Sequence, residues 1–168
     1  LAVANGSTLE TSADRLLLRP ERMFLFNNRG SRFLDVAPVA GKTIAGERVA
    51  RGLAAADFDG DGDVDLAVSV NRGNPILLRN DTATDHRSLI VQLTAAPASL
   101  FGARIEVEVG DQTHTRWYGA DVSFLSMHAP EVVFGLGDAS AANSVRVVWA
   151  DGSETELSDV PAGRVTME

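Results

Sequence analysis

The sequence predicts an all-β protein, and three observations support that fold class. Apolar residues alternate with polar ones over residues 103–109 and again over 145–149, the period of a strand with one wet face. Short strand-like runs are bounded by Gly, Pro, Asn or Asp, at roughly the 8–12-residue spacing of all-β proteins. A single segment, 11–22, has a composition that suits a short helix, and Pro20 would end it.

The predicted strands are shorter in the first half of the chain than in the second. In the first half they cover 23–26, 32–36, 52–58, 64–70 and 75–79. In the second half they cover 89–93, 103–109, 113–118, 131–134, 145–149, 153–157 and 164–167. Asp151-Gly152, which separates two of these strands, is a strong signal for a tight β-hairpin.

A polar segment, 80–87, separates the two halves. It reads Asn-Asp-Thr-Ala-Thr-Asp-His-Arg and has little strand character. Upstream strands are punctuated by Asp and Gly, whereas downstream strands are longer and alternate cleanly. We therefore expect two parts, residues 1–83 and residues 84–168, of which the second is a β-sandwich-like domain.

The composition excludes several classes of function. The chain has 168 residues, no cysteine and a net charge of -8. Such a surface repels phosphate backbones, so nucleic acid is not an expected partner, while cations are. Disulfide and thiolate chemistry are excluded, and no apolar run approaches the ~20 residues that a membrane span needs. Lys42 is the single lysine among many arginines and alanines, a coding bias that suggests a bacterial source.

One motif carries recognisable chemistry. Residues 57–65 read Asp-Phe-Asp-Gly-Asp-Gly-Asp-Val-Asp, which places five carboxylates within nine residues. Two carboxylates ~4 Å apart repel by about 1 kcal/mol in water and ~4 kcal/mol at an effective dielectric constant of 20. A cation would relieve this repulsion, and oxygen ligands favour a hard one. Gly60 and Gly62 allow the tight turns of a loop that surrounds an ion.

The spacing of the motif favours calcium. If Asp57 is loop position 1, the ligand positions 1, 3, 5, 7 and 9 of a calcium loop are occupied. These positions are Asp57, Asp59, Asp61, the carbonyl of Asp63, and Asp65. Position 12 is Val68 rather than glutamate, and strands flank the loop, which excludes a helix–loop–helix hand. We expect a mainly structural Ca2+ between two strands; the alternatives are a catalytic ion and a solvated acidic turn.

Around this motif the sequence resembles a known repeat family. Residues 51–68 resemble an FG-GAP/VCBS-type repeat, one blade of a calcium-binding β-propeller, and residues 23–36 resemble the connector between blades. Further motifs recur in the order of an ASPIC/UnbV domain, which closes proteins similar to cartilage acidic protein. They are Gly102–Arg104, Phe124–Ser126, Phe134–Gly137, Val145–Trp149 with Asp151-Gly152, and Asp159–Ala162.

The resemblance implies a partial propeller-like blade followed by a β-sandwich-like domain. It also implies a calcium-binding, non-enzymatic protein that is extracellular, at the cell surface or periplasmic. One blade cannot close a propeller, and open blade edges promote aggregation. We therefore expect a longer parent chain or an oligomer. The segment from Leu1 has no signal-peptide pattern, so we expect any such peptide on a longer precursor.

Other candidate residues point less clearly to function. Three histidines lack a second ligand at metal-binding spacing, so we expect them on the surface or in the core. They are His86, His114 and His128. A triad of Asp121, Ser126 and His128 lacks the turn that frames a nucleophilic serine. Trp117-Tyr118 would suit sugar stacking, although packing in a core or interface is favoured.

These observations predict a secreted calcium-binding module rather than an enzyme. We expect it to serve adhesion, scaffolding, or carbohydrate or protein binding, with a protein or carbohydrate as the unknown partner. The alternative is an accessory domain of an enzyme or of a natural-product biosynthesis protein, in which calcium also contacts the substrate. That role needs an open coordination position and a nearby base, and no base is identifiable.

Overall fold

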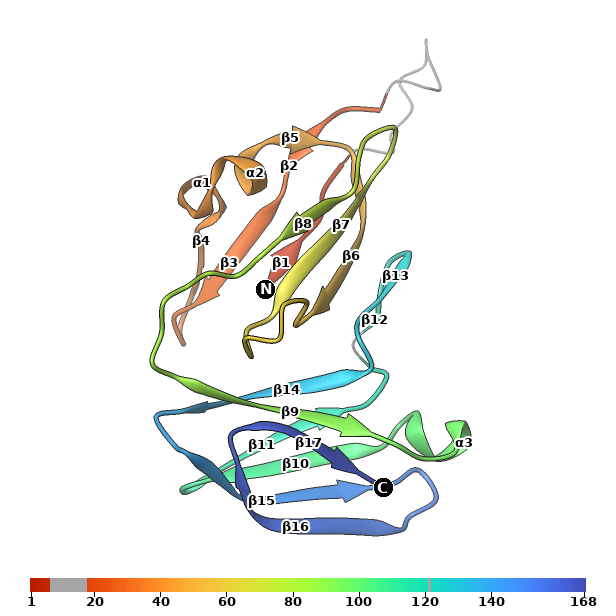
Figure 1. Cartoon of the computed structure of the whole chain (residues 1–168). Helices are drawn as coiled ribbons and strands as arrows, with labels where there is room; N and C mark the ends of the chain where they lie inside the picture. The colour runs from red at the N-terminus through yellow and green to blue at the C-terminus, as the bar shows by residue number, and fades with distance from the viewer. Residues whose placement is uncertain (7–17, 121) are drawn as a thin grey trace. The chain divides into compact units, whose positions relative to one another are not determined.

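The chain folds almost entirely into strands, so the all-β prediction is confirmed. The structure is a computed structural model that describes residues 1–6, 18–120 and 122–168 (Figure 1). The chain divides into two compact units. The N-terminal unit comprises Leu1–Ala55, Asp65–Arg79 and Ser123–Met127, and the C-terminal unit comprises Ala56–Val64, Asn80–Val122 and His128–Glu168.

The N-terminal unit is built from small sheets. One sheet has the order β1 (Ala2–Val3), β3 (Phe24–Asn28) and β4 (Phe33–Asp35). A second pairs β2 (Glu21–Arg22) with β5 (Glu47–Arg48), and a third has the order β6 (Ala50–Ala56), β7 (Asp65–Val70) and β8 (Ile76–Leu78). Two short helices follow β4: α1 (Ala37–Ala40) and α2 (Lys42–Ala45).

Side chains from these strands and helices share one apolar cluster. Its buried members are Met23, Ala37, Ile44, Ala50, Leu53 and Val68. Asp35 at the end of β4 accepts a hydrogen bond from Arg22 at 2.6 Å and one from the backbone N–H of Ala37 at 3.1 Å. The same carboxylate thereby joins a strand to the first turn of α1.

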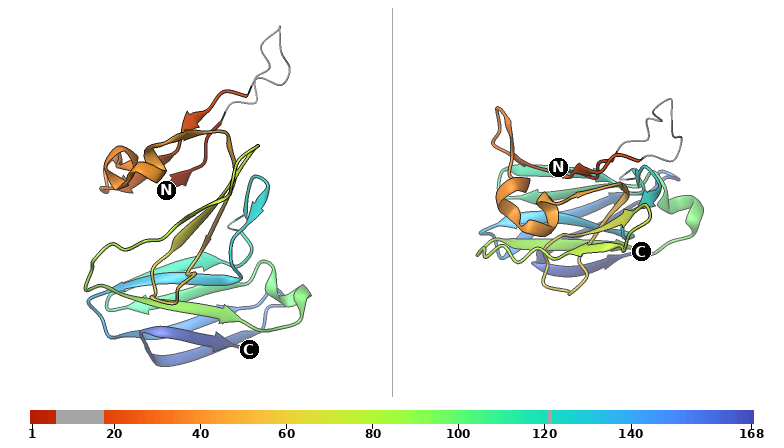
Figure 2. Two further views of the ribbon diagram at one scale, coloured as in Figure 1. Left: turned by 45° about the horizontal axis from the view of Figure 1, so that its top comes forward. Right: turned by 90° about the horizontal axis from the view of Figure 1, so that it is seen from above.

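The C-terminal unit is a sandwich of two sheets (Figure 1, Figure 2). The smaller sheet has the order β14 (Glu131–Gly137), β9 (Arg87–Leu93) and β17 (Gly163–Met167), with β17 parallel to β9. The larger has the order β11 (Gln112–Trp117), β10 (Arg104–Val109), β15 (Ala141–Val148) and β16 (Glu154–Pro161). A short helix, α3 (Pro97–Leu100), precedes β10.

Both sheets contribute to a single core, as in a β-sandwich. Val91 and Phe134 come from the smaller sheet, and Ile105 and Val147 from the larger, and each is at most 1% exposed. The alternation of residues 103–109 is explained by this core, because every second residue of β10 enters it.

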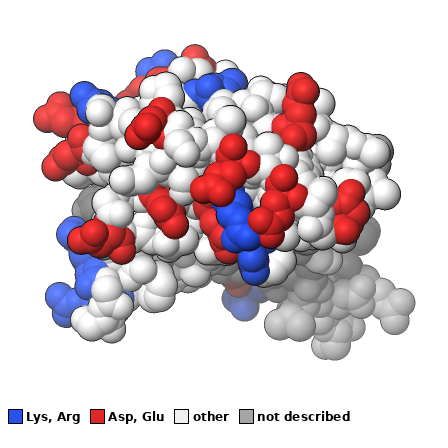
Figure 3. Space-filling model, turned by 90° about the horizontal axis from the view of Figure 1, so that it is seen from below, with Lys and Arg blue, Asp and Glu red and all other residues white. Residues whose placement is uncertain are grey.

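The outer face of the larger sheet is charged. Glu106 lies 3.0 Å from the guanidinium groups of both Arg104 and Arg146, and Arg146 also pairs with Glu154 at 2.6 Å. Hydrogen bonds to Glu154 and Glu106 raise the pKa of Arg146 above its usual value. Seen from below, acidic groups outnumber basic ones on this side of the molecule (Figure 3).

The predicted hairpin at Asp151-Gly152 is present. It joins β15 to β16, which pair from Val148 and Glu154 onward. Asp151 accepts hydrogen bonds from the backbone and the hydroxyl of Ser153, which lowers the pKa of the Asp151 carboxyl. Gly152 has φ 87°, a conformation that favours glycine.

The helix expected within 11–22 is not tested over residues 11–17, which lie outside the described residues. Residues 18–20 are not helical, and after Pro20, where the helix was expected to break, Glu21–Arg22 form strand β2. Glu21 stands opposite Arg48 and Arg22 opposite Glu47, so both cross-strand pairs join opposite charges. None of the helices in the described ranges is long and apolar enough to cross a membrane.

Candidate metal centre

The aspartate motif forms the loop of a β-hairpin. Strand β6 ends at Ala56, β7 begins at Asp65, and the two strands are neighbours in one sheet. Three carboxylates of the loop converge: Asp57, Asp59 and Asp61 each have an oxygen within 4.8 Å of the others. The structure thus brings together the first three residues of the predicted ligand set.

Hydrogen bonds inside the loop explain how the carboxylates converge. Asp57 accepts the backbone N–H of Gly60 at 2.8 Å with one oxygen and that of Gly62 at 3.2 Å with the other. Asp61 likewise accepts the N–H of Asp63 at 2.9 Å. Because each carboxylate binds an N–H further along the chain, the backbone curls around the acidic groups.

Two glycines make this path sterically accessible. Gly60 has φ 80° and Gly62 has φ 94°, both in the left-handed region that side chains disfavour. No heavy atom lies within 4 Å of a Cβ built on Gly60, whereas one built on Gly62 would lie 2.7 Å from Ser88 Oγ. The second glycine therefore also permits close packing.

The chemistry of the cluster suits a hard cation. The carboxylate oxygens have lone pairs beyond those used by the loop N–H groups. Asp57 is half-buried and Asp59 and Asp61 are exposed, so an ion can reach them from solvent. The attraction of each carboxylate to a cation placed among them outweighs the repulsion between the carboxylates.

The last two predicted ligands are placed differently. Asp65 is the first residue of β7, and it is 1% exposed. Neither its carboxylate nor that of Asp63 belongs to the converging group of three. Because the Asp63 ligand was expected to be a carbonyl, this placement does not test it. The full set of five ligands stays a prediction.

A serine from strand β9 of the same unit supports the loop. Ser88, the second residue of β9, donates a hydrogen bond from its hydroxyl to the carbonyl of Gly62 at 2.7 Å. This contact fixes a carbonyl in the middle of the loop. Sequence reasoning missed Ser88, because it lies 26 residues from Gly62 and no local pattern connects the two.

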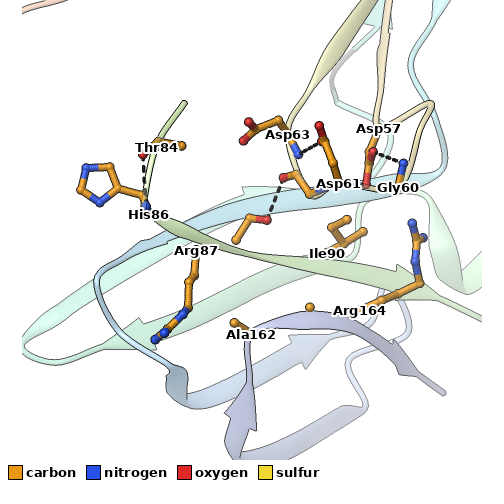
Figure 4. Close-up of a pocket in the computed structure, with 13 residues that line it drawn as sticks. Asp57, Gly60, Asp61, Asp63, Thr84, His86, Arg87, Ile90, Ala162 and Arg164 are labelled. Carbon is orange, nitrogen blue, oxygen red and sulfur yellow. Dashed lines mark hydrogen bonds between the residues drawn. The ribbon is translucent and has the colours of Figure 1, made fainter. Parts of the chain in front are cut away.

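The loop forms one wall of an open pocket of about 370 Å³ (Figure 4). Polar side chains and backbone from β9, β17 and the segments before them form the other wall. The lining residues are Asp57, Gly60, Asp61, Gly62, Asp63, Thr84, His86, Arg87, Ser88, Ile90, Ala162, Gly163 and Arg164. His86 pairs with Asp138 at 3.0 Å, and Arg164 pairs with Glu131. The pocket therefore combines carboxylates with basic groups.

The other sequence candidates are placed as follows. Ser126 lies in β13 (Ser126–Met127), beside β12 (Val122–Ser123), and its hydroxyl donates to the carbonyl of Leu53 at 2.7 Å. Asp121 lies outside the described residues. Within the described ranges, no histidine joins a group of three metal-binding side chains.

The two adjacent aromatic residues differ in exposure. Trp117 is 51% exposed. Tyr118 packs against the sandwich core and meets the ring of Phe101 edge to face at 5.9 Å. The core-packing expectation thus describes Tyr118, whereas Trp117 offers an aromatic surface to solvent.

Comparisons with known families agree with the order of the sequence motifs. A family model described as FG-GAP-like repeat matches residues 12–68, which include the aspartate loop. A model described as ASPIC and UnbV matches residues 94–167. No curated protein matches the chain. The suspected architecture is therefore confirmed: an FG-GAP-like repeat is followed by an ASPIC and UnbV domain.

Proposed function

We propose that this chain is a non-enzymatic binding module stabilised by calcium. The observation that carries the proposal is the convergence of the carboxylates of Asp57, Asp59 and Asp61 within 4.8 Å of one another. Asp65 and the carbonyl of Asp63 would complete the oxygen shell. Calcium fits better than magnesium, since it accepts six to eight oxygen ligands in flexible geometry, whereas magnesium keeps several waters.

The role of the ion in this proposal is mainly structural. An ion that binds the folded loop and not the unfolded chain stabilises the folded state by mass action. The hydrogen bond from Ser88 to Gly62 ties the loop to β9. Calcium would hold the carboxylates in place, and the hydrogen bond from Ser88 holds the loop backbone.

As a biological role we propose adhesion or scaffolding outside the cell, or in the periplasm, through a protein or carbohydrate ligand. A β-rich repeat followed by an ASPIC and UnbV domain suits a repeat or accessory module rather than a catalyst. The acidic surface, with a net charge of -8, disfavours nucleic acid as a partner.

Calorimetric titration with Ca2+ tests the metal assignment. We expect one site per chain, with heat of binding that Asp59→Ala abolishes, because the variant removes one converging carboxylate. Glu108→Gln, which removes one negative charge on the larger sheet, is the matched control and should bind Ca2+ as the unsubstituted protein does. Equal binding of Mg2+, or unchanged binding by Asp59→Ala, would contradict the proposal.

A second function is favoured by the pocket beside the loop. Because Asp57 and Asp61 line this pocket, a substrate bound there would lie close to the ion, as in an accessory domain of an enzyme or a biosynthetic protein. Tb3+ luminescence lifetimes in H2O and D2O count the waters on an ion bound in the loop. At most one water indicates a structural ion, and two or more indicate open positions for a substrate.

A further inference from the structure

The sandwich has four edge strands in its described part: β11, β16, β14 and β17. Three of them carry features that discourage pairing with another chain. Strand β16 presents Glu154 and Glu156 and ends at Pro161. Strand β14 has a register shift after Gly135, and β17 has five residues beginning with Gly163. Charges, proline, bulges and short length are the usual ways to protect an edge.

Strand β11 has the fewest of these features, a single permanent charge and no proline or register shift. It pairs with β10 through six consecutive residues, from Gln112 to Trp117, without a register shift. Its sequence, Gln-Thr-His-Thr-Arg-Trp, contains no proline or glycine and includes Arg116 as its one permanently charged residue. It is therefore a regular strand whose outer edge is open.

The hydrogen-bond register shows which backbone groups point outward. The N–H of Tyr118 donates to the carbonyl of Ala103 at 2.8 Å, across the same antiparallel pair. Hydrogen-bonded and non-hydrogen-bonded pairs alternate along such a ladder. The N–H and C=O groups of Thr113, Thr115 and Trp117 therefore point away from β10.

Most of these outward groups have no partner in the part of the chain that the structure describes. The carbonyl of Thr115 accepts a hydrogen bond from its neighbour Arg116 at 3.1 Å, and that of Trp117 accepts one from Ala120 at 3.4 Å. The N–H groups of Thr113, Thr115 and Trp117 and the carbonyl of Thr113 have no hydrogen-bond partner among the described residues. They form a row at every second residue, which matches the spacing of a neighbouring strand.

We propose that β11 is a docking strand for an extended peptide segment of a partner protein. The segment would add to the larger sheet as a fifth strand, with main-chain hydrogen bonds providing affinity and alternate side chains providing specificity. This inference names a partner class for the binding role proposed above and rests on that role. It does not rest on the metal.

The side chains of β11 indicate which segment fits. Trp117 is 51% exposed on the same face as Thr113 and Thr115, and it offers apolar area to a β-branched or aromatic residue of the segment. Arg116 is exposed on the other face, above the ring of Phe134 at 5.8 Å, and suits a carboxylate. The segment should therefore alternate apolar and polar residues and carry an acidic side chain opposite Arg116.

A second copy of this chain fits the edge less well. Antiparallel pairing of two β11 strands about Thr115 would place Arg116 opposite His114 of the second copy, which supplies no carboxylate. Each copy also has a net charge of -8, so the approach of two copies is repulsive. Charge complementarity thus favours a different protein.

Hydrogen exchange measured by NMR tests the proposal. The probe is a synthetic peptide with blocked ends, in which valine alternates with threonine and one central threonine is replaced by glutamate. We expect the amides of Thr113, Thr115 and Trp117 to exchange about tenfold more slowly at ninety per cent occupancy by the peptide. Unchanged exchange at saturating peptide, or equal protection along β16, would overturn the proposal.

Matched proline variants test the edge itself. Thr115→Pro removes an outward N–H without breaking a bond to β10, and it should abolish protection. Glu156→Pro makes the same change on the β16 edge and should leave protection at β11 intact.

Should Thr115→Pro fail to fold, as judged by its melting curve, Arg116→Glu provides a second test. This variant should prefer a lysine-containing probe by tenfold or more, and an unchanged preference for the glutamate probe would overturn the proposal.

Two further arms separate this inference from other outcomes. Protection that rises with protein concentration in the absence of peptide would identify a second copy as the occupant and overturn the proposed partner. Repeating the experiment with calcium and with chelator separates the edge from the metal site. Peptide protection that survives chelation supports the edge even if calcium binding fails.

Discussion

At the scale of single residues, the candidate site depends on two glycines and a serine as much as on aspartates. Asp57, Asp59 and Asp61 converge because the loop backbone turns at Gly60 and Gly62. Sequence reasoning could identify the aspartates, since their spacing is local and their repulsion implies a cation.

Two features of the site could not be predicted from the sequence. The support from Ser88 depends on strand β9, whose approach to the loop is a property of the fold. The burial of Asp65 likewise follows from the packing of β7 rather than from any pattern within the motif.

Alanine substitutions at the two glycines should have different effects. Gly60→Ala meets no neighbouring atom, so its cost is that of a left-handed residue, about 1–2 kcal/mol. Gly62→Ala adds a contact of 2.7 Å with Ser88 Oγ, and it should lower the melting temperature and the calcium affinity further. Thermal melting and calcium titration of both variants measure this difference. Equal losses in the two variants would show that the Ser88 contact is unimportant.

At the scale of elements, alternation predicted the strands well because one face of each is buried. Strands β10 and β15 alternate between core and surface over the residues that the sequence indicated. The helices α1, α2 and α3 were not predicted, since each has four residues and is too short to show a helical period. The pairing of β2 with β5 joins segments about 26 residues apart, which no local pattern reveals.

The junction of β4 and α1 should respond to acid. Partial burial alone would raise the pKa of Asp35, but hydrogen bonds from Arg22 and from the backbone N–H groups of Ala37 and Leu25 lower it below 3.8. The ionised carboxylate therefore stabilises the folded state at pH values above the ordinary pKa. This contribution is lost as the pH falls through the lower, folded-state pKa.

Melting curves from pH 7 down to pH 2 measure the contribution of Asp35. At pH 7, Asp35→Asn should have a lower melting temperature than the unsubstituted protein. The difference between the two melting temperatures should disappear as the pH falls below about 3.8. Glu108→Gln is the control: it removes an exposed carboxylate that takes no part in the ion pairs of Glu106 and Glu154 with Arg104 and Arg146, and it should keep a constant small gap. A gap for Asp35→Asn that persists to pH 2 would assign its effect to packing rather than charge.

At the scale of the whole molecule, the sequence predicted a β-rich repeat and a sandwich, and the two family matches agree with that order. The sandwich follows from pattern, because both sheets contribute alternate apolar residues to one core. The choice of edge strands does not, since it depends on the order β11-β10-β15-β16. Sequence alone therefore gives no reason to single out β11.

The central claim is that calcium bound in the aspartate loop stabilises this fold. Thermal melting with excess Ca2+, with Mg2+ and after chelation tests that claim most directly, with Asp59→Ala and Glu108→Gln as the paired variants. At a calcium concentration 100 times the dissociation constant, one native-state site adds about 2.7 kcal/mol, or roughly 5–11 °C for a chain of this size. We predict a shift of that order, specific to calcium, retained by Glu108→Gln and lost in Asp59→Ala. Melting temperatures that are the same with calcium and after chelation would contradict the account.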